Sequence, residues 1–315
     1  MQILDLASYL PAGIIDNRRL SELTGRDSEF FLRRTGIQER RRAAADENTN
    51  TMALCAVRAL SAQSQALLPD VDLVVGCSYT SWDLIGTLAH AVQRGCGLRR
   101  ARAFTLSSAC SSVANALEVA AAFFDAGRSE CALIVAADHN SLYSDDSDSH
   151  SGHLWGDGAA ALLLQRTPRA GAPFAVLDVW TAGLAHMGKG PEALALRPHA
   201  DGLTMPNGRD VFVQACEGME SAARLLLERN GLQPADVRLL VPHQANQRII
   251  DHVADSLGIA PESVASTIAH YGNTGCASAI ITLQQHQQRL QAGELALIVT
   301  FGGGYSAGAA LLRKQ

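Results

Sequence analysis

Lysine is almost absent from this 315-residue chain: only Lys189 and Lys314 occur, and arginine supplies the rest of the positive charge. The net charge of −5 at pH 7 argues against nucleic acid as the main partner. No run of about 18 apolar residues is present, so the sequence predicts no membrane-spanning helix. The first residues lack a basic segment followed by a long apolar one, and we therefore expect a cytoplasmic protein.

Closely spaced cysteine pairs are missing as well. Seven cysteines are scattered without a CxxC pair, at positions 55, 77, 96, 110, 131, 216 and 276. Their odd number and wide spacing argue against both a disulfide framework and a zinc site. We therefore expect no bound metal, and we expect most of these thiols to be reduced core residues.

Similar segments recur in the two halves of the chain, which indicates an internal duplication. The pairs are "DVDLVVGCS" (70–78) with "DVRLLVPHQ" (236–244), "AGRSECALIVAADHN" (126–140) with "AGELALIVTFGGG" (292–304), and "WGDGAAALLLQ" (155–165) with "YSAGAALLRKQ" (305–315). Strands alternate with helices in each half, as is typical of layered α/β proteins. We predict a five-layer αβαβα sandwich of two halves, residues 1–170 and 171–315, joined near 166–174 where proline and glycine interrupt the pattern.

Cys110 lies in "SSACSSVANALEVAAAFFDAG" (107–127), between a predicted strand and a helix that we expect from Ser111 to Asp125. The free N–H groups and the dipole at a helix start favour an anion, so we expect a lowered thiol pKa and a nucleophilic thiolate. The same position also suits a small cysteine that only packs in the core. The residues of this segment alone leave both interpretations open.

Three segments of the second half follow predicted strands or helices, at the sheet edge where α/β proteins bind ligands. They place His243 in "VPHQANQRII", Asn273 in "HYGNTGCAS" and three glycines in "FGGGYSAG". Each has a purely structural interpretation, because a histidine can cap a helix, and asparagine and glycine are common in turns. Only their combination with Cys110 indicates a reactive site.

Together these segments resemble the β-ketoacyl-acyl carrier protein synthase III family of the thiolase superfamily. The resemblance runs nearly from end to end, through "SYLP", "RRTGIQER", the cysteine segment, "WGDGAAA", "VPHQAN", "YGNTG" and "FGGG". It implies a thiolase-like acyltransferase that takes an acyl group from acyl-CoA, or from an acyl carrier, onto Cys110. A decarboxylative Claisen condensation with malonyl-ACP or malonyl-CoA then follows, and neither a metal nor a cofactor is required.

The resemblance also implies a role for individual residues. Cys110 is the nucleophile, His243 and Asn273 stabilise the enolate, and the backbone N–H groups of Cys110 and Gly303 form the oxyanion hole. The remaining positions are a coenzyme A tunnel at Phe30, Arg34, Phe212, Ala245 and Asn246, an acyl-pocket gate at Ile85, and carrier docking at Arg248. The resemblance further implies a homodimer in which the loop from Trp82 to Thr87 reaches the neighbour's acyl pocket.

Several positions depart from the family pattern. Phe30 stands where members commonly carry tryptophan, and a second arginine expected before "WGDG" is absent. Val213, Asp251 and Asp255 occupy positions that are basic in fatty-acid-initiating relatives, which weakens docking of an acidic carrier protein. We therefore predict a specialised member. Two alternatives stay open: transfer of the Cys110-bound acyl group to a non-malonyl carbon, oxygen or nitrogen nucleophile, and an inactive subunit that supports a paralogous partner.

Overall fold

Strands and helices alternate along most of the chain in the computed structural model, which describes residues 1–315. The strands are β1 (Gln2–Tyr9), β2 (Gly13–Asp16), β3 (Glu39–Arg42), β4 (Leu73–Cys77), β5 (Arg102–Leu106), β6 (Cys131–His139), β7 (Asp157–Gln165), β8 (Phe174–Gly183), β9 (Ala195–Arg197), β10 (Gly202–Thr204), β11 (Val237–Pro242), β12 (Leu295–Gly302) and β13 (Ser306–Lys314). The helices are α1 (Asn17–Thr24), α2 (Ser28–Thr35), α3 (Thr49–Arg58), α4 (Ala62–Gln65), α5 (Leu88–Gly95), α6 (Ser112–Asp125), α7 (Gly208–Arg229), α8 (Gln247–Leu257), α9 (Ile268–Tyr271) and α10 (Ser278–His286).

Nine strands form the main sheet in the order β11-β12-β13-β8-β1-β7-β6-β4-β5. On one side, β4 and β6 are parallel and β7 is antiparallel to β6; on the other, β11 and β12 are parallel and β13 is antiparallel to β12. The repeated order β4-β6-β7 and β11-β12-β13 matches the predicted repeat, segment by segment. The sequence does not predict that β8 also pairs with β1, through Gln2 and Ile3, and so joins the two halves into one sheet.

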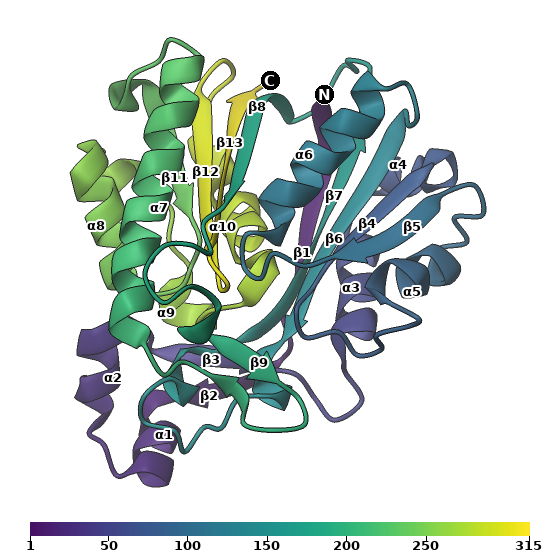
Figure 1. Ribbon diagram of the computed structural model, residues 1–315. Helices are drawn as coiled ribbons and strands as arrows, with labels where there is room; N and C mark the ends of the chain where they lie inside the picture. The colour runs from purple at the N-terminus through teal and green to yellow at the C-terminus, as the bar shows by residue number, and fades with distance from the viewer.

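Helices pack on both faces of this sheet and form layers with it (Figure 1). Helices α3 and α5 cover the outer face of the first half, α7 and α8 cover the outer face of the second, and α6 and α10 lie between them. The buried apolar residues form three large clusters of 32, 23 and 21 residues, one between the halves and one beneath each outer helix layer. The predicted five-layer thiolase-like fold is therefore confirmed.

The connection between β7 and β8 contains the predicted boundary of the two halves. Strand β7 ends at Gln165 and β8 begins at Phe174. The division into 1–170 and 171–315 as separate domains stays a proposal. None of the helices combines the length and the apolar character needed to cross a membrane.

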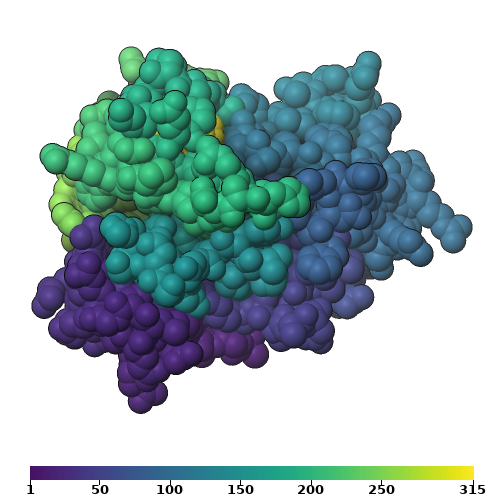
Figure 2. Space-filling model, turned by 60° about the horizontal axis from the view of Figure 1, so that its bottom comes forward, coloured from purple at the N-terminus to yellow at the C-terminus, as the bar shows by residue number.

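Short elements from distant parts of the chain meet at one end of the sheet. Seen from below, the purple N-terminal segment, teal residues near position 150 and green residues near position 200 lie beside one another (Figure 2). The green part includes the two-stranded hairpin of β9 and β10. This end also carries the loops that follow β5, β11 and β12, and these loops hold the candidate site.

Candidate active site

Cys110 lies in a tight turn between β5 and α6, which begins at Ser112, one residue later than predicted. The preceding residue, Ala109, has a φ of 47° and is the only non-glycine residue with positive φ in the chain. A non-glycine residue in the left-handed region costs about 1–2 kcal/mol, so the surrounding structure must hold this turn. Gly302 lets the β12 backbone pack directly against this turn, because a Cβ at position 302 would lie 2.2 Å from the carbonyl oxygen of Ser108.

The Cys110 thiol is buried, and its pKa does not follow the sequence-based expectation. Burial raises that pKa to about 12, with a further contribution from the nearby carboxylate of Asp138. The prediction that the helix start lowers the pKa of the free thiol was therefore wrong, because loss of water around the sulfur outweighs the favourable end of α6. The resting side chain is a neutral thiol.

His243 follows β11 and is buried beside Cys110 in the same cavity. Burial lowers its pKa to about 4, so the ring is neutral near pH 7. The backbone N–H of Gln244 donates to the Ser278 hydroxyl oxygen at 3.3 Å, and that hydroxyl lies 2.6 Å from His243 Nδ1. Since Ser278 has no other acceptor for its proton, Ser278 donates to Nδ1, and this assigns the ring proton to Nε2.

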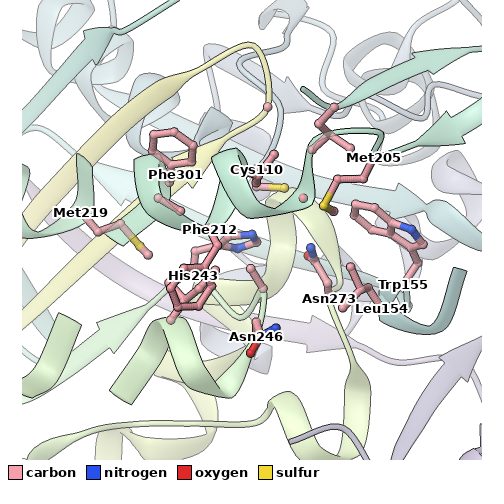
Figure 3. A pocket seen from close by; sticks show the side chains of 17 residues that line it. Cys110, Leu154, Trp155, Met205, Phe212, Met219, His243, Asn246, Asn273 and Phe301 are labelled. Atoms are coloured by element: carbon pink, nitrogen blue, oxygen red, sulfur yellow. The ribbon is translucent and has the colours of Figure 1, made fainter. Parts of the chain in front are cut away.

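Asn273 lies in the turn after α9, and its amide is oriented by the next residues. The backbone N–H of Gly275 donates to Asn273 Oδ1 at 3.0 Å, which leaves the Nδ2 group as a donor. The backbone of Asn273 is tied to the first half, because its N–H donates to the Leu154 carbonyl and its carbonyl accepts from the Gly156 N–H. Cys110, His243 and Asn273 point into one space (Figure 3).

Two backbone N–H groups that belong to residues lining the cavity have no acceptor in another residue of the chain. Neither the N–H of Cys110 nor that of Gly303 donates a hydrogen bond to another protein group. Cys110 is buried and Gly303 is half-buried, and both line the cavity. Their free N–H groups are therefore available to an oxygen atom of a ligand.

The cavity has two arms that share Cys110. The helix arm, with a volume of about 90 Å³, runs along α7 and the start of α8, past Phe212, Ala245 and Asn246. The hairpin arm, with a volume of about 340 Å³, runs from Cys110 past Tyr79 and Trp155 to β9. Three of the five residues expected along the tunnel thus line the helix arm.

The other predicted tunnel residues lie beyond the lining of this arm. Phe30 is covered by the guanidinium groups of both Arg26 and Arg34, each 5.3 Å from the ring centre. The backbone carbonyl of Arg34 accepts from Asn246 Nδ2 at 3.2 Å, so α2 adjoins the start of α8. Arg248 lies over the ring of Phe212 at 5.6 Å and is exposed at the same end.

Ile85 does not line the cavity of its own chain. Its side chain is 90% exposed, and the neighbouring Leu84 and Trp82 are also exposed. The assignment of Ile85 as the acyl-pocket gate therefore stays a prediction, which requires the loop from Trp82 to Thr87 to reach the pocket of a neighbouring chain. The walls of the hairpin arm come from β9 and from Tyr79. Local sequence patterns did not predict the β9–β10 hairpin, so these wall residues were missed.

Tyr79 and Asn140 are site residues that the sequence analysis missed. Tyr79 Oη lies 4.0 Å from Cys110 Sγ and donates to Asn140 Oδ1 at 2.6 Å. Asn140 Nδ2 donates in turn to the backbone carbonyls of Gly156 and Asn273, at 2.7 and 3.2 Å. These polar residues carry no motif of their own, and only the fold brings them together.

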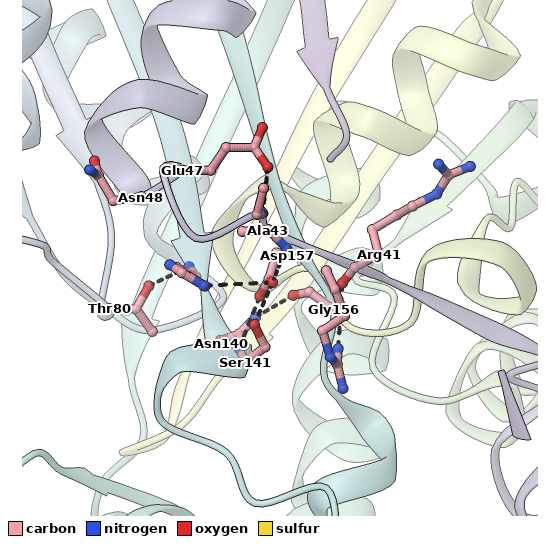
Figure 4. A network of polar contacts seen from close by, with 12 residues as sticks. Arg41, Ala43, Glu47, Asn48, Thr80, Asn140, Ser141, Gly156 and Asp157 are labelled. Atoms are coloured by element: carbon pink, nitrogen blue, oxygen red, sulfur yellow. Dashed lines mark hydrogen bonds and ion pairs between the residues drawn. The ribbon is translucent and has the colours of Figure 1, made fainter. Parts of the chain in front are cut away.

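A buried carboxylate holds the "WGDG" segment in place (Figure 4). Asp157 accepts from the backbone N–H of Ala43 and from both the N–H and the hydroxyl of Ser141. Gly156 has no room for a side chain, because a Cβ there would lie 1.9 Å from the Tyr271 carbonyl oxygen. The motif therefore fixes the wall that carries Trp155 and supports Asn273.

Comparison with known proteins assigns a family to this arrangement. Residues 227–314 match the family model 3-oxoacyl-[acyl-carrier-protein (ACP)] synthase III C terminal, and residues 104–183 match 3-oxoacyl-[acyl-carrier-protein (ACP)] synthase III. The chain is 35% identical to the beta-ketoacyl-[acyl-carrier-protein] synthase III of Rhodospirillum centenum, over 99% of this chain and 98% of that protein.

Solved structures agree with this likeness. The 3-oxoacyl-[acyl-carrier-protein] synthase III of Aquifex aeolicus superposes with a TM-score of 0.91 at 31% identity, over 99% of both chains. The priming β-ketosynthase of the R1128 polyketide biosynthetic pathway superposes with a TM-score of 0.90 at 30% identity, over 100% of this chain and 96% of that one. The chain therefore belongs to the β-ketoacyl-[acyl-carrier-protein] synthase III family of thiolase-like acyltransferases.

Proposed function

We propose that Cys110 accepts an acyl group from a coenzyme A thioester and that His243 and Asn273 support its decarboxylative condensation with a malonyl thioester. The observation that carries the proposal is the set of groups at the junction of the two arms. A thiol, an Nε2–H imidazole and a carboxamide meet there beside two unpaired backbone N–H groups. No metal or cofactor is required for the steps below.

In the first step, Cys110 Sγ attacks the acyl carbonyl carbon. A new carbon–sulfur bond forms at Cys110, the bond to the coenzyme A sulfur breaks, and the Cys110 proton ends on the departing thiol. The N–H groups of Cys110 and Gly303 donate to the oxyanion that develops on the carbonyl oxygen. The Nε2–H tautomer of His243 leaves no free ring lone pair, which supports a deprotonation that does not pass through His243.

In the second step, a malonyl thioester enters the helix arm. Its carbon–carboxylate bond breaks, carbon dioxide leaves, and the electron pair forms an enolate whose oxygen accepts from His243 Nε2–H and Asn273 Nδ2. The enolate carbon then attacks the acyl group and displaces the Cys110 sulfur, which takes up a proton to restore the thiol. A neutral imidazole suits this task, because its donated proton stays on the ring.

The surface around the helix arm supports a specialised role. Asp251 and Asp255 are exposed on α8, where Arg248 is the only arginine, and Val213 is exposed on α7. An acidic carrier protein would meet carboxylates here, which disfavours its docking. We therefore propose a coenzyme A thioester as donor, with either malonyl-CoA or malonyl-ACP as extender, and we keep a cytoplasmic location as a prediction.

A homodimer is part of the proposal. Trp82, Leu84 and Ile85 form an exposed apolar loop, and pairing of two chains would bury it. In such a dimer Ile85 would reach the hairpin arm of the neighbouring chain. We expect a dimer in sedimentation equilibrium at micromolar concentration and a monomer for Ile85→Glu; a monomeric wild-type protein would contradict this part of the proposal.

The central test is intact-protein mass spectrometry after incubation with a panel of acyl-CoAs. We expect the acyl mass on wild-type protein and on the control Cys216→Ala, which removes another buried cysteine, and no added mass on Cys110→Ala. Addition of malonyl-CoA, malonyl-ACP or non-malonyl nucleophiles to the acylated protein identifies the acceptor. Acyl label on Cys110→Ala would overturn the assignment, and release of the acyl group only to a non-malonyl acceptor would favour the alternative acyltransferase.

A further inference from the structure

Arg197 is the only charged side chain that lines the hairpin arm. Eight of the twelve lining residues are hydrophobic. The two ionisable groups near the bottom, Cys110 and Tyr79, are neutral because burial raises the pKa of both. A permanent positive charge therefore belongs to an otherwise apolar cavity that begins at the thiol.

This guanidinium has no partner within the chain. No carboxylate lies within ion-pair distance of Arg197, and its side chain donates no hydrogen bond, whereas Arg42 and Arg166 each bind an acidic residue. The hairpin register pairs Arg197 with Gly202, which has no side chain to offer. Nothing on the opposite strand neutralises the charge.

Arg197 also lies at the far end of the arm from the thiol. Cys110 is buried, whereas Arg197 is exposed at the end of β9. All three residues of β9, Ala195, Leu196 and Arg197, line the arm, and of these only Arg197 is exposed. A chain attached to Cys110 and extending along the arm therefore passes apolar walls first and meets the guanidinium last.

We propose that the hairpin arm accepts acyl groups that end in a carboxylate, so that the donor is a monothioester of a dicarboxylic acid. The inference rests on the proposed acylation of Cys110 and names its substrate class. A guanidinium binds a carboxylate through two parallel charge-assisted hydrogen bonds. A chain with a methyl end would instead displace water from Arg197 without replacing its hydrogen bonds.

The test compares donors that differ only at the chain end. Glutaryl-, adipyl- and pimelyl-CoA are each paired with the coenzyme A thioester in which an isopropyl group replaces the terminal carboxylate, which keeps the number of heavy atoms. The measured quantity is the second-order rate of Cys110 acylation, followed by intact mass. We expect at least one dicarboxylic donor to exceed its isopropyl partner by about tenfold or more, the usual effect of a hydrogen bond to a charged group.

Variants at Arg197 assign this preference to the guanidinium. Arg197→Met should remove the preference: the rates of the dicarboxylic donors fall, and those of the isopropyl donors stay equal or rise, because these chains no longer displace water from a guanidinium. Arg197→Glu should lower the rates of the dicarboxylic donors further. Arg100→Met, which removes another exposed and unpaired arginine outside the cavity, should keep the wild-type preference.

The outcomes separate this inference from the proposed function. Acylation by isopropyl donors together with equal or slower acylation by every dicarboxylic donor would overturn the inference and leave the proposed function intact. The same holds if the preference survives in Arg197→Met. Failure of both donor classes to acylate Cys110 would count against the proposed function itself.

Discussion

The two half-reactions should separate when His243 or Asn273 is replaced by alanine. In the proposed reaction, acylation of Cys110 depends on the nucleophile turn and on the two backbone N–H groups, which neither substitution touches. Decarboxylation in this proposal depends on two donors to the enolate oxygen, and each substitution removes one of them. We therefore expect both variants to accept an acyl group and to fail at condensation.

The size of the loss follows from the surroundings of the two donors. His243 and Asn273 are 2% and 4% exposed, so water does not replace a missing donor easily. Removal of one preorganised donor to an oxyanion costs about 2.7–4 kcal/mol, or roughly 100- to 1000-fold in rate. Acylation should stay within about fivefold of the wild-type rate, because the thiol and its N–H donors keep their positions.

Single-turnover experiments measure the two steps separately. Rapid quenching followed by intact mass spectrometry gives the acylation rate, and release of labelled carbon dioxide from malonyl-CoA gives the decarboxylation rate. Equal losses in both steps of His243→Ala would refute the reasoning and identify His243 as the base that deprotonates Cys110. Normal decarboxylation by Asn273→Ala would remove Asn273 from the site.

Three further predictions concern the support of the site. Ser278→Ala removes the donor to His243 Nδ1, and we expect decarboxylation to fall about tenfold or more with acylation unchanged, since partners that orient a reactive histidine typically contribute that much; an unchanged decarboxylation rate would contradict the assigned tautomer. Gly302→Ala places a Cβ against the backbone of the nucleophile turn, so acylation should fall about 100-fold, whereas Gly183→Ala, with open space around its Cβ, should act as wild type. His153 is buried with its pKa lowered to about 4. Because the unfolded chain takes up a proton below about pH 6.5 and the folded one does not, stability is full above that pH and is lost toward pH 4. His153→Leu should recover about 2 kcal/mol of the stability lost between pH 7.5 and pH 5.0, measured by urea unfolding, and an identical pH dependence in both proteins would refute this.

The sequence predicts the parts of this protein that local patterns encode. Repeated strand–helix patterns predict the two halves, and conspicuous segments around Cys110, His243 and Asn273 predict the residues that meet at the cavity. The pairing of β1 with β8 is not predictable in this way, because it joins distant segments that share no motif.

Properties that depend on the three-dimensional surroundings were missed or misjudged. The pKa of Cys110 depends on how much water reaches the sulfur, and a helix start in the sequence says nothing about that. Tyr79 and Arg197 line the cavity only because the loop after β4 and the β9–β10 hairpin fold back toward Cys110. The exposed position of Ile85 likewise depends on which surfaces of the chain are covered.

The shared junction of the two arms has a kinetic consequence. In the proposed reaction, the acyl chain and the sulfur of Cys110 occupy the hairpin arm and the junction after the first step, so only the helix arm is left for the second substrate. Coenzyme A must therefore leave through the passage by which the malonyl thioester arrives. Initial-rate plots against one substrate at several concentrations of the other should give parallel lines. An excess of either thioester should slow turnover, because each competes for the same entrance with the partner that the next step requires.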